Sequence, residues 1–240
     1  MQRVHSGRQA NKSCAPWTGG RVPLGAMKQI EPKWLPWARE LQALAQTGLA
    51  FTRDLYDQDR YKRLRQISAE IYSEYTGVPT QSIEDLFAGE TGYATPKAGV
   101  RAAVFDEEDR ILLVREVQDG GRWTLPGGWA DVNLTPAENA VKEVAEESGY
   151  RVSITKLAAV WDNTRQKHPN ATHSLYLMFF ICDLEGGEPA TSLETSEISW
   201  FREKEIPEDL SRTRVLPNQI ARMFEHRRSP NLATDYDLID

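Results

Sequence analysis

The chain has 240 residues, of which 40 % are hydrophobic and 27 % charged, and its formal net charge is −6. This composition is typical of a globular protein, and no apolar run approaches the ~20 residues that a membrane helix needs, so we expect no membrane partner. The two cysteines, Cys14 and Cys182, stand far apart in the chain. They argue against a disulfide framework or a cysteine zinc site and favour a reducing cytoplasm.

The charge is unevenly distributed along the chain. Residues 1–30 hold five basic residues and no acidic one, so they carry +5 and leave −11 for the other 210 residues. An acidic body is a poor surface for phosphates, and we therefore expect no nucleic-acid partner. The basic segment lacks the continuous apolar stretch of a secretory signal, although an organelle transit peptide stays open. We expect residues 1–30 to be a disordered extension, or to precede a true start at Met27.

Residues 31–90 have the pattern of a small helical domain. A first helix is expected from Trp34, closed by Gly48. Its apolar stripe contains Trp37, Leu41, Leu44 and Ala45. A second helix is expected over residues 58–75 with Asp57 as its N-cap, and a short third one over residues 82–87.

These short helices bury little surface by themselves, so their apolar stripes need a partner. The partner is either the rest of the chain or the same helices of a second subunit, and we favour a homodimer. Residues 88–96 are rich in Gly, Thr and Ala, which is typical of a linker.

Residues 96–228 alternate between strand and helix patterns, and residues 229–240 form an acidic tail. Strands are expected over residues 99–105, 111–117, 152–160, 174–183 and 197–201, and helices over residues 136–148 and 217–227. A turn is expected at residues 185–187. Strands interleaved with two helices predict an α/β fold in which a mixed sheet lies between helices.

The helix expected over residues 136–148 has strong signals at both ends. Thr135 is a suitable N-cap, Pro136 fits the first helical position, and Glu138 completes a capping box. Gly149 is a typical residue just beyond a C-terminus. Two glycines, Gly127 and Gly128, precede the helix and allow its backbone to approach a ligand closely.

Three glutamates, Glu143, Glu146 and Glu147, lie within one turn of this helix and share one arc of it. They repel one another, and they lie near the helix C-terminus, where the macrodipole disfavours anions. A bound cation would offset both penalties. Hard oxygen ligands at this spacing suit Mg²⁺ or Mn²⁺ better than zinc, and such an ion can neutralise a pyrophosphate and activate water.

Residues 127–150 resemble the Nudix box, G-x5-E-x7-R-E-U-x-E-E-x-G-U with U aliphatic. Gly128, Glu143, Glu146, Glu147 and Gly149 occupy matching positions. Leu134, Lys142 and Tyr150 depart from the pattern, at the first Glu, the Arg and the closing aliphatic residue respectively. The resemblance implies the Nudix α/β/α sandwich, with Glu143 and Glu147 as core metal ligands, Glu146 next and the Gly127 carbonyl as a fourth.

The N-terminal segment resembles the helical domain that precedes some bacterial Nudix hydrolases of X-linked nucleoside diphosphates. The resemblance rests on Trp34-Leu-Pro-Trp-Ala-Arg-Glu-Leu and on Tyr56-Asp-Gln-Asp-Arg-Tyr. That subgroup includes enzymes similar to CDP-choline and ADP-ribose pyrophosphatases. The two resemblances span residues 32–225. They imply a homodimeric, Mg²⁺-dependent pyrophosphohydrolase, with Mn²⁺ able to substitute, that releases a nucleoside monophosphate and a phosphorylated X.

Further residues are candidates for roles around the box. Lys142 could orient the carboxylates, Arg101 and Arg115 could reach the diphosphate, and Trp129 could line the base pocket. Glu194 and Glu197 are both candidates for the general base, and we assign the catalytic role to Glu197. The loop 162–173 has the length and polarity of a substrate-side lid, and we do not expect its two histidines to bind zinc.

Two other functions stay open at this point. One is a Nudix hydrolase that acts on RNA 5′ ends or nucleoside triphosphates. The other is a catalytically inactive Nudix sensor, which is suggested by the departures from the Nudix pattern at Leu134 and Lys142.

Overall fold

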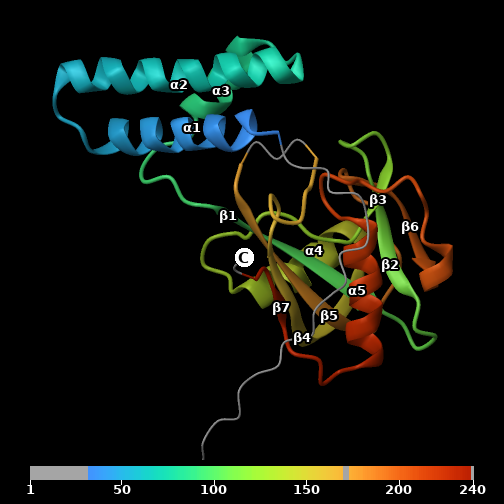
Figure 1. Ribbon diagram of the computed structural model, residues 1–240. Helices are drawn as coiled ribbons and strands as arrows, with labels where there is room; N and C mark the ends of the chain where they lie inside the picture. The colour runs from blue at the N-terminus through green and yellow to red at the C-terminus, as the bar shows by residue number, and fades with distance from the viewer. Residues whose placement is uncertain (1–31, 170–172, 239–240) are drawn as a thin grey trace, which may run out of the picture. The chain divides into compact units, whose positions relative to one another are not determined.

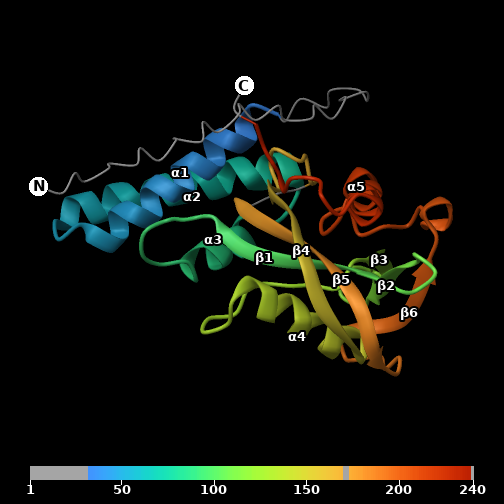
Figure 2. The ribbon, with the colours of Figure 1, turned by 90° about the horizontal axis from the view of Figure 1, so that it is seen from below.

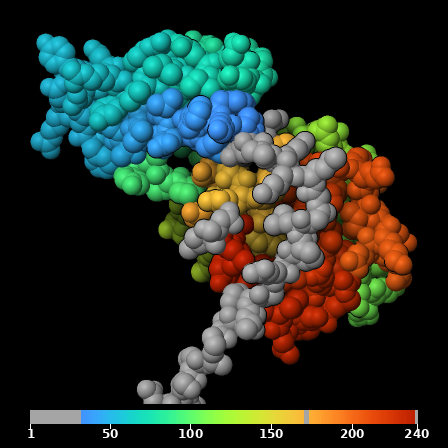
Figure 3. Space-filling model, viewed as in Figure 1, coloured from blue at the N-terminus to red at the C-terminus, as the bar shows by residue number. Residues whose placement is uncertain are grey.

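The computed structural model describes residues 32–169 and 173–238, so the expectation for residues 1–30 lies outside the described residues. Three helices come first: α1 (Trp34–Phe51), α2 (Leu55–Thr76) and α3 (Thr80–Ala88). Figures 1 and 3 show α1 and α2 packed along their length. All three helices contribute to one small core, which contains Leu35, Ala38, Ala69, Tyr72, Ile83 and Phe87. In the described part of the chain, no helix is both long and apolar enough to cross a membrane.

Two expected helix ends are wrong. Gly48 does not close α1, because it lies against α2, where an added Cβ would stand 2.3 Å from the ring of Tyr61. It is therefore a close-approach glycine between two helices, and α1 continues to Phe51. The N-cap of α2 is Asp54, whose carboxylate accepts the N–H of Asp57 at 3.0 Å.

The predicted apolar stripe of α1 is divided between two environments. Ala45 is fully buried, whereas Trp37 and Leu44 are 60 % and 54 % exposed. Phe51, at the end of the same helix, is 68 % exposed. Trp37, Leu44 and Phe51 recur every seven residues, so they lie on one face of α1. We call these three residues the α1 face.

The strands that follow the three helices form one mixed seven-stranded sheet. Its strands are β1 (Lys97–Phe105), β2 (Ile111–Glu116), β3 (Arg122–Thr124), β4 (Tyr150–Asp162), β5 (Leu175–Gly187), β6 (Thr195–Phe201) and β7 (Asp235–Tyr236). The order is β3-β2-β1-β5-β4-β7, and β6 pairs with β2. The β1–β5 and β4–β7 pairs are parallel and the others antiparallel, which confirms the mixed sheet.

Two helices cover opposite faces of the sheet, as Figure 2 shows: α4 (Pro136–Ser148) and α5 (Pro217–Arg228). On the α4 side, Ala140 and Val144 pack on Val100, Ala102 and other apolar side chains of the strands. On the α5 side, Ile220, Met223 and Phe224 pack on a second cluster. The α/β/α sandwich is therefore confirmed, and each face of the sheet has its own core.

The sequence beyond residue 183 differs from expectation. The turn predicted at residues 185–187 is wrong, because β5 continues to Gly187, which pairs with Tyr150 of β4. Part of the segment expected as an acidic tail also joins the sheet, where Asp235 pairs with Ala159. The carboxylate of Asp235 accepts hydrogen bonds from Arg222 of α5, one of them at 2.8 Å.

Strands β1 and β2 separate from each other soon after their connecting turn, and their pairing is confined to Phe105 and Ile111. Residues 126–130 fill the opening beside β1. The N–H groups of Ala102 and Val100 donate to the carbonyls of Pro126 and Gly128, both at 2.9 Å. This opening, which we call the split, places the Gly-Gly segment in the middle of the sheet.

Candidate active site

The start of α4 is fixed by side chains. The Thr135 hydroxyl accepts the Glu138 N–H at 3.2 Å, and the Glu138 carboxylate accepts the Thr135 N–H at 2.7 Å, so the predicted capping box is present. The buried Asn139 amide accepts the Asp131 N–H at 2.9 Å and donates to the Thr135 carbonyl at 3.1 Å. The loop before α4 is thereby tied to the helix.

Two of the three box glutamates point into the split. Glu147 is only 3 % exposed, and its carboxylate accepts the Gly127 N–H at 3.0 Å. Burial raises the pKa of Glu147 to about 7, against the opposing effects of that hydrogen bond and of Arg101. Burial also raises the pKa of Glu143, whose carboxylate lies against Gly128, where an added Cβ would stand 2.8 Å from it.

Gly127 has no substitute at its position. Its φ is +144°, and an added Cβ would lie 2.1 Å from the Val100 carbonyl oxygen and 2.9 Å from Nη1 of Arg101. Only glycine avoids these contacts, so the Gly-Gly segment can press against β1 while it donates to Glu147.

The third glutamate faces elsewhere. The Glu146 side chain is 58 % exposed, and its carboxylate is 2.8 Å from Nζ of Lys142. The same Nζ is 3.2 Å from the Asp131 carboxylate. Lys142 therefore pairs with Glu146, and the structure separates Glu146 from the Glu143 and Glu147 pair.

The donor set can be tested against a divalent cation. Within residues 32–169 and 173–238, no three His, Cys, Asp or Glu side chains are already gathered as a metal cluster. The pair of Glu143 and Glu147 nevertheless suits a hard cation, because both are oxygen donors and a cation would relieve the cost of burying their charges. The residues fit as a partial ligand set that carbonyl oxygens, water or substrate would complete.

Arg101 is brought to the site but is buried there. The residue is 5 % exposed. Its Nη1 donates to the Val100 carbonyl at 3.1 Å, and its Nε donates to the Arg214 carbonyl at 3.3 Å. Burial, and next the positive charge of Arg214, lower the pKa of Arg101 to about 10, whereas the charges of Glu147 and Glu143 oppose this shift.

Two charged residues near Arg101 were missed at the level of sequence. Glu116, at the end of β2, is 2 % exposed and forms an ion pair with Nη2 of Arg214 at 3.3 Å. Glu116 has the same parity in β2 as the apolar residues Leu112 and Val114, and this alternation was a usable signal that it faces inward. Arg214 lies in the connection before α5, and its sequence context carries no comparable signal.

Arg115 and Glu197 pair with each other. Their side chains approach to 3.3 Å, Arg115 is also 3.3 Å from the Asp209 carboxylate, and its guanidinium stacks 5.0 Å from the ring centre of Trp123. The other candidate base, Glu194, precedes β6, and its negative charge contributes to the raised pKa of Glu143. Of the two glutamates, Glu197 is held in an ion pair with Arg115, whereas Glu194 acts on the box only through its charge.

Trp129 and His168 have contrasting environments. Trp129 follows the Gly-Gly segment and is 56 % exposed, with Nζ of Lys97 lying 5.7 Å from its ring centre. His168 is buried, and its Nδ1 is 3.1 Å from the Arg212 carbonyl oxygen. Burial lowers its pKa. Residues 170–172 of the expected lid lie outside the described residues.

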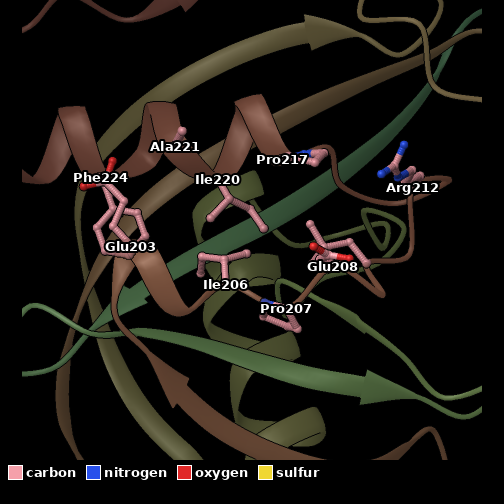
Figure 4. A pocket seen from close by; sticks show the side chains of 10 residues that line it. Glu203, Ile206, Pro207, Glu208, Arg212, Pro217, Ile220, Ala221 and Phe224 are labelled. Atoms are coloured by element: carbon pink, nitrogen blue, oxygen red, sulfur yellow. The ribbon is translucent and has the colours of Figure 1, made fainter.

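A cavity of about 460 Å³ lies elsewhere, between α5 and the connection that precedes it (Figure 4). Ile206, Ile220 and Phe224 form its apolar wall, and Glu203 and Arg212 are among its charged residues. Glu143, Glu147 and the Gly-Gly segment do not line it. The candidate site is therefore the split with its carboxylates and not this cavity.

Comparison with known families matches both parts of the chain. Residues 32–87 match the family described as a UDP-X-like N-terminal oligomerisation domain, and residues 95–220 match the NUDIX domain. The second range contains the split, the Gly-Gly segment and α4.

Individual relatives agree with these matches. YjhB of Bacillus subtilis (strain 168), provisionally named an ADP-ribose pyrophosphatase, is 43 % identical over 88 % of this chain and 100 % of its own length. A crystal structure of an ADP-ribose pyrophosphatase from Streptococcus suis 89-1591 is 36 % identical, with a TM-score of 0.54, over 60 % of this chain and 100 % of that one. A crystal structure of a UDP-X diphosphatase is 28 % identical, with the same TM-score of 0.54, over 85 % and 97 %. The chain therefore belongs to the Nudix family, as a Nudix pyrophosphohydrolase whose catalytic domain follows a UDP-X-like N-terminal oligomerisation domain.

Proposed function

We propose that this enzyme hydrolyses the pyrophosphate bond of a nucleoside diphosphate linked to X, such as ADP-ribose or CDP-choline, to a nucleoside monophosphate and a phosphorylated X. Mg²⁺ would be its cofactor, with Mn²⁺ able to substitute. The observation that carries the proposal is the buried pair of Glu143 and Glu147 beside the Gly-Gly segment. The names of the relatives, which refer to ADP-ribose and UDP-X, support the substrate class.

The roles of the residues follow from their positions. Glu143 and Glu147 would hold the cation, with the Gly127 carbonyl as a further oxygen donor. A bound divalent cation neutralises the diphosphate and makes water a better nucleophile. Glu194 is the preferred general base because Glu197 is engaged by Arg115.

The remaining candidates act at the edge of the site. Lys142 would restrain Glu146, which could then join the cation only after that ion pair opens. Exposed Trp129 would stack on a nucleobase. We assign no direct substrate role to Arg115, because two carboxylates and an aromatic ring already engage it.

The test is a substrate screen with product identification. ADP-ribose, CDP-choline, UDP-sugars and dinucleoside polyphosphates are incubated with Mg²⁺ or Mn²⁺, and the products are identified by mass, with Glu147→Gln as the control. Nucleoside monophosphate plus phosphorylated X supports the proposal. Release of inorganic pyrophosphate from triphosphates would favour the nucleoside triphosphate alternative, and ligand binding without turnover would favour an inactive sensor.

We also propose that the helical domain forms a homodimer in which a second copy covers the α1 face. Trp37, Leu44 and Phe51 are all more than half exposed, which is unusual for large apolar side chains clustered on one helix face. The family description of the domain as an oligomerisation domain supports this partner. Obligate homodimer interfaces are similarly apolar.

The dimer is tested by placing a charge on the α1 face. Leu44→Arg should convert the dimer to a monomer in analytical ultracentrifugation, because a buried unpaired charge costs several kcal/mol. Leu193→Arg is the matched control, since Leu193 is 98 % exposed and lies outside the helical domain. A Leu44→Arg variant with an unchanged sedimentation coefficient would reject this interface.

A further inference from the structure

The split contains a group of charges that the proposed function leaves unassigned. Besides Glu143 and Glu147 it holds Arg101, Arg214 and Glu116, and the charges of Arg214 and all three glutamates act on Arg101. The two arginines come from β1 and from the connection before α5, on the side of the sheet opposite to α4. The split therefore brings two arginines from one side of the sheet close to the carboxylates of Glu143 and Glu147 on the other side.

Arg101 is committed to the main chain. It is 5 % exposed, two of its N–H groups donate to the Val100 and Arg214 carbonyls, and its Nη1 would lie 2.9 Å from a Cβ added to Gly127. Contact with a ligand would require Arg101 to give up these hydrogen bonds. Arg101 instead packs against Gly127 of the Gly-Gly segment, and its hydrogen bond to the Arg214 carbonyl holds the main chain at Arg214 in place.

Arg214 has the opposite character. Its side chain is 29 % exposed, and among the described residues its guanidinium makes one polar contact, the ion pair with Glu116. A guanidinium has five N–H donors, so most of those of Arg214 stay available for an anionic ligand. Glu116, buried at 2 % exposure, fixes the direction of the side chain without covering it.

Charge balance indicates what that ligand is. A cation bound to Glu143 and Glu147 offsets their charges, and Glu116 offsets one of the two arginines, so one positive charge is left in the split. A planar guanidinium matches the geometry of two phosphate oxygens.

We propose that Arg214, oriented by Glu116, binds the diphosphate of the substrate, and that Arg101 is a positioning residue that supports both Arg214 and the Gly-Gly segment. This inference rests on the proposed function for the identity of the substrate, but it can be tested by binding alone.

The experiment measures equilibrium binding by calorimetry with Mg²⁺ and two probes, α,β-methylene-ADP, which carries a non-cleavable diphosphate, and inorganic pyrophosphate. Arg214→Met should weaken both by at least about tenfold, the amount expected for a lost charge-assisted hydrogen bond. Mn²⁺ binding, followed by electron paramagnetic resonance, should stay within about twofold, because Arg214 does not contact Glu143 or Glu147. Arg214→Lys should fall between Met and wild type, because it keeps the charge and loses the fork.

Arg212→Met is the matched control, because Arg212 lies two residues away and lines the separate cavity of Figure 4. It should leave both probes unaffected. Arg101→Met should weaken Mn²⁺ binding as well as probe binding, since it removes the support beneath Gly127. If Arg214→Met does not fold, Glu116→Gln and Arg214→Lys provide the same comparison, each with an expected loss of about threefold or more in probe affinity.

Three outcomes would overturn the proposal: probe affinity within twofold of wild type in Arg214→Met, an equal loss in Arg212→Met, or a loss for α,β-methylene-ADP without one for pyrophosphate. Wild-type protein that binds neither probe would also overturn it. Absence of turnover in the substrate screen, together with a selective loss of probe binding in Arg214→Met, would reject the proposed function and support this inference.

Discussion

Replacing Glu147 by glutamine should stabilise the metal-free protein while it removes most of the activity. Glu147 is 3 % exposed, and its carboxylate accepts one hydrogen bond, from the Gly127 N–H at 3.0 Å. Glutamine keeps a carbonyl oxygen that can accept the same hydrogen bond, but it carries no charge. Without a cation, the substitution therefore removes the cost of a buried anion.

The magnitude follows from the pKa of Glu147, which burial raises from 4.5 to about 7. A group with a raised folded-state pKa contributes fully below pH 4.5, and that contribution is lost as the pH rises to about 7. At 1.36 kcal/mol per pH unit, the loss is about 3 kcal/mol above pH 7. The new amide N–H groups need partners, which reduces the gain by about 1 kcal/mol. The net gain of about 2 kcal/mol corresponds to a rise in Tm of about 4–8 °C.

The assay is thermal unfolding of wild type and Glu147→Gln with EDTA at pH 5 and pH 8, alongside turnover with Mg²⁺. The variant should be clearly more stable at pH 8 and nearly equal to wild type at pH 5. Its kcat should fall by about 10³-fold or more, because a ligand of the cation is lost. A variant that is no more stable than wild type at pH 8 would refute the reasoning about the buried charge, and unchanged kcat would refute the metal assignment.

Three further predictions concern the frame around the site. Gly127→Ala should lose about 3 kcal/mol or more in urea unfolding and should bind Mn²⁺ more weakly, because its Cβ would stand 2.1 Å from the Val100 carbonyl oxygen at a φ of +144°; a variant with wild-type stability and Mn²⁺ affinity would contradict this. Burial alone would raise the pKa of Asp235, but hydrogen bonds from Arg222 and His226 hold it at about 2, below its usual 3.8. Asp235→Asn should therefore cost up to about 2 kcal/mol at pH 7, and about half of that difference should vanish by pH 3, because Asp235 of the unfolded chain takes up its proton below its usual pKa while the folded protein keeps the carboxylate ionised; a difference independent of pH would exclude this origin. Thr135→Ala should lower the unfolding free energy by about 1 kcal/mol, whereas Thr135→Ser, which keeps the cap, should not.

Local signals made α4 and its glutamates predictable from the sequence. Thr135, Glu138 and Gly149 act within a few residues of one another, so their capping roles do not depend on the rest of the fold. Alternation of apolar residues located most strands for the same reason, although β4 and β5 are longer than the pattern indicated. The mixed sheet between two helices followed from the order of these elements.

Features that depend on distant contacts were not predictable. Gly48 was expected to close α1, but its role is set by the ring of Tyr61 on the neighbouring helix. The divergence of Glu146 from Glu143 and Glu147 depends on Asp131, which helps hold Lys142. Helical spacing alone places the three glutamates on one arc and cannot tell which of them turns towards solvent.

The partner of Arg214 also could not be read from the sequence, because nearly a hundred residues separate it from Glu116. Pairing Arg115 with Glu197 required knowledge that β6 lies beside β2. In each case the residue type was visible, and the missing information was which strand would lie next to which.

The split between β1 and β2 has a consequence for how enzymes with this architecture can diversify. Glu143 and Glu147 approach the split from the α4 layer, while Arg101 lies on the other side of the sheet, where its Nε donates to the Arg214 carbonyl. Substitutions in the connection before α5 would thus change the surroundings of Arg214 without altering the helix that carries Glu143 and Glu147. If Arg214 binds the diphosphate, substrate recognition and metal binding would depend on different segments of one domain, which meet at a single gap in the sheet.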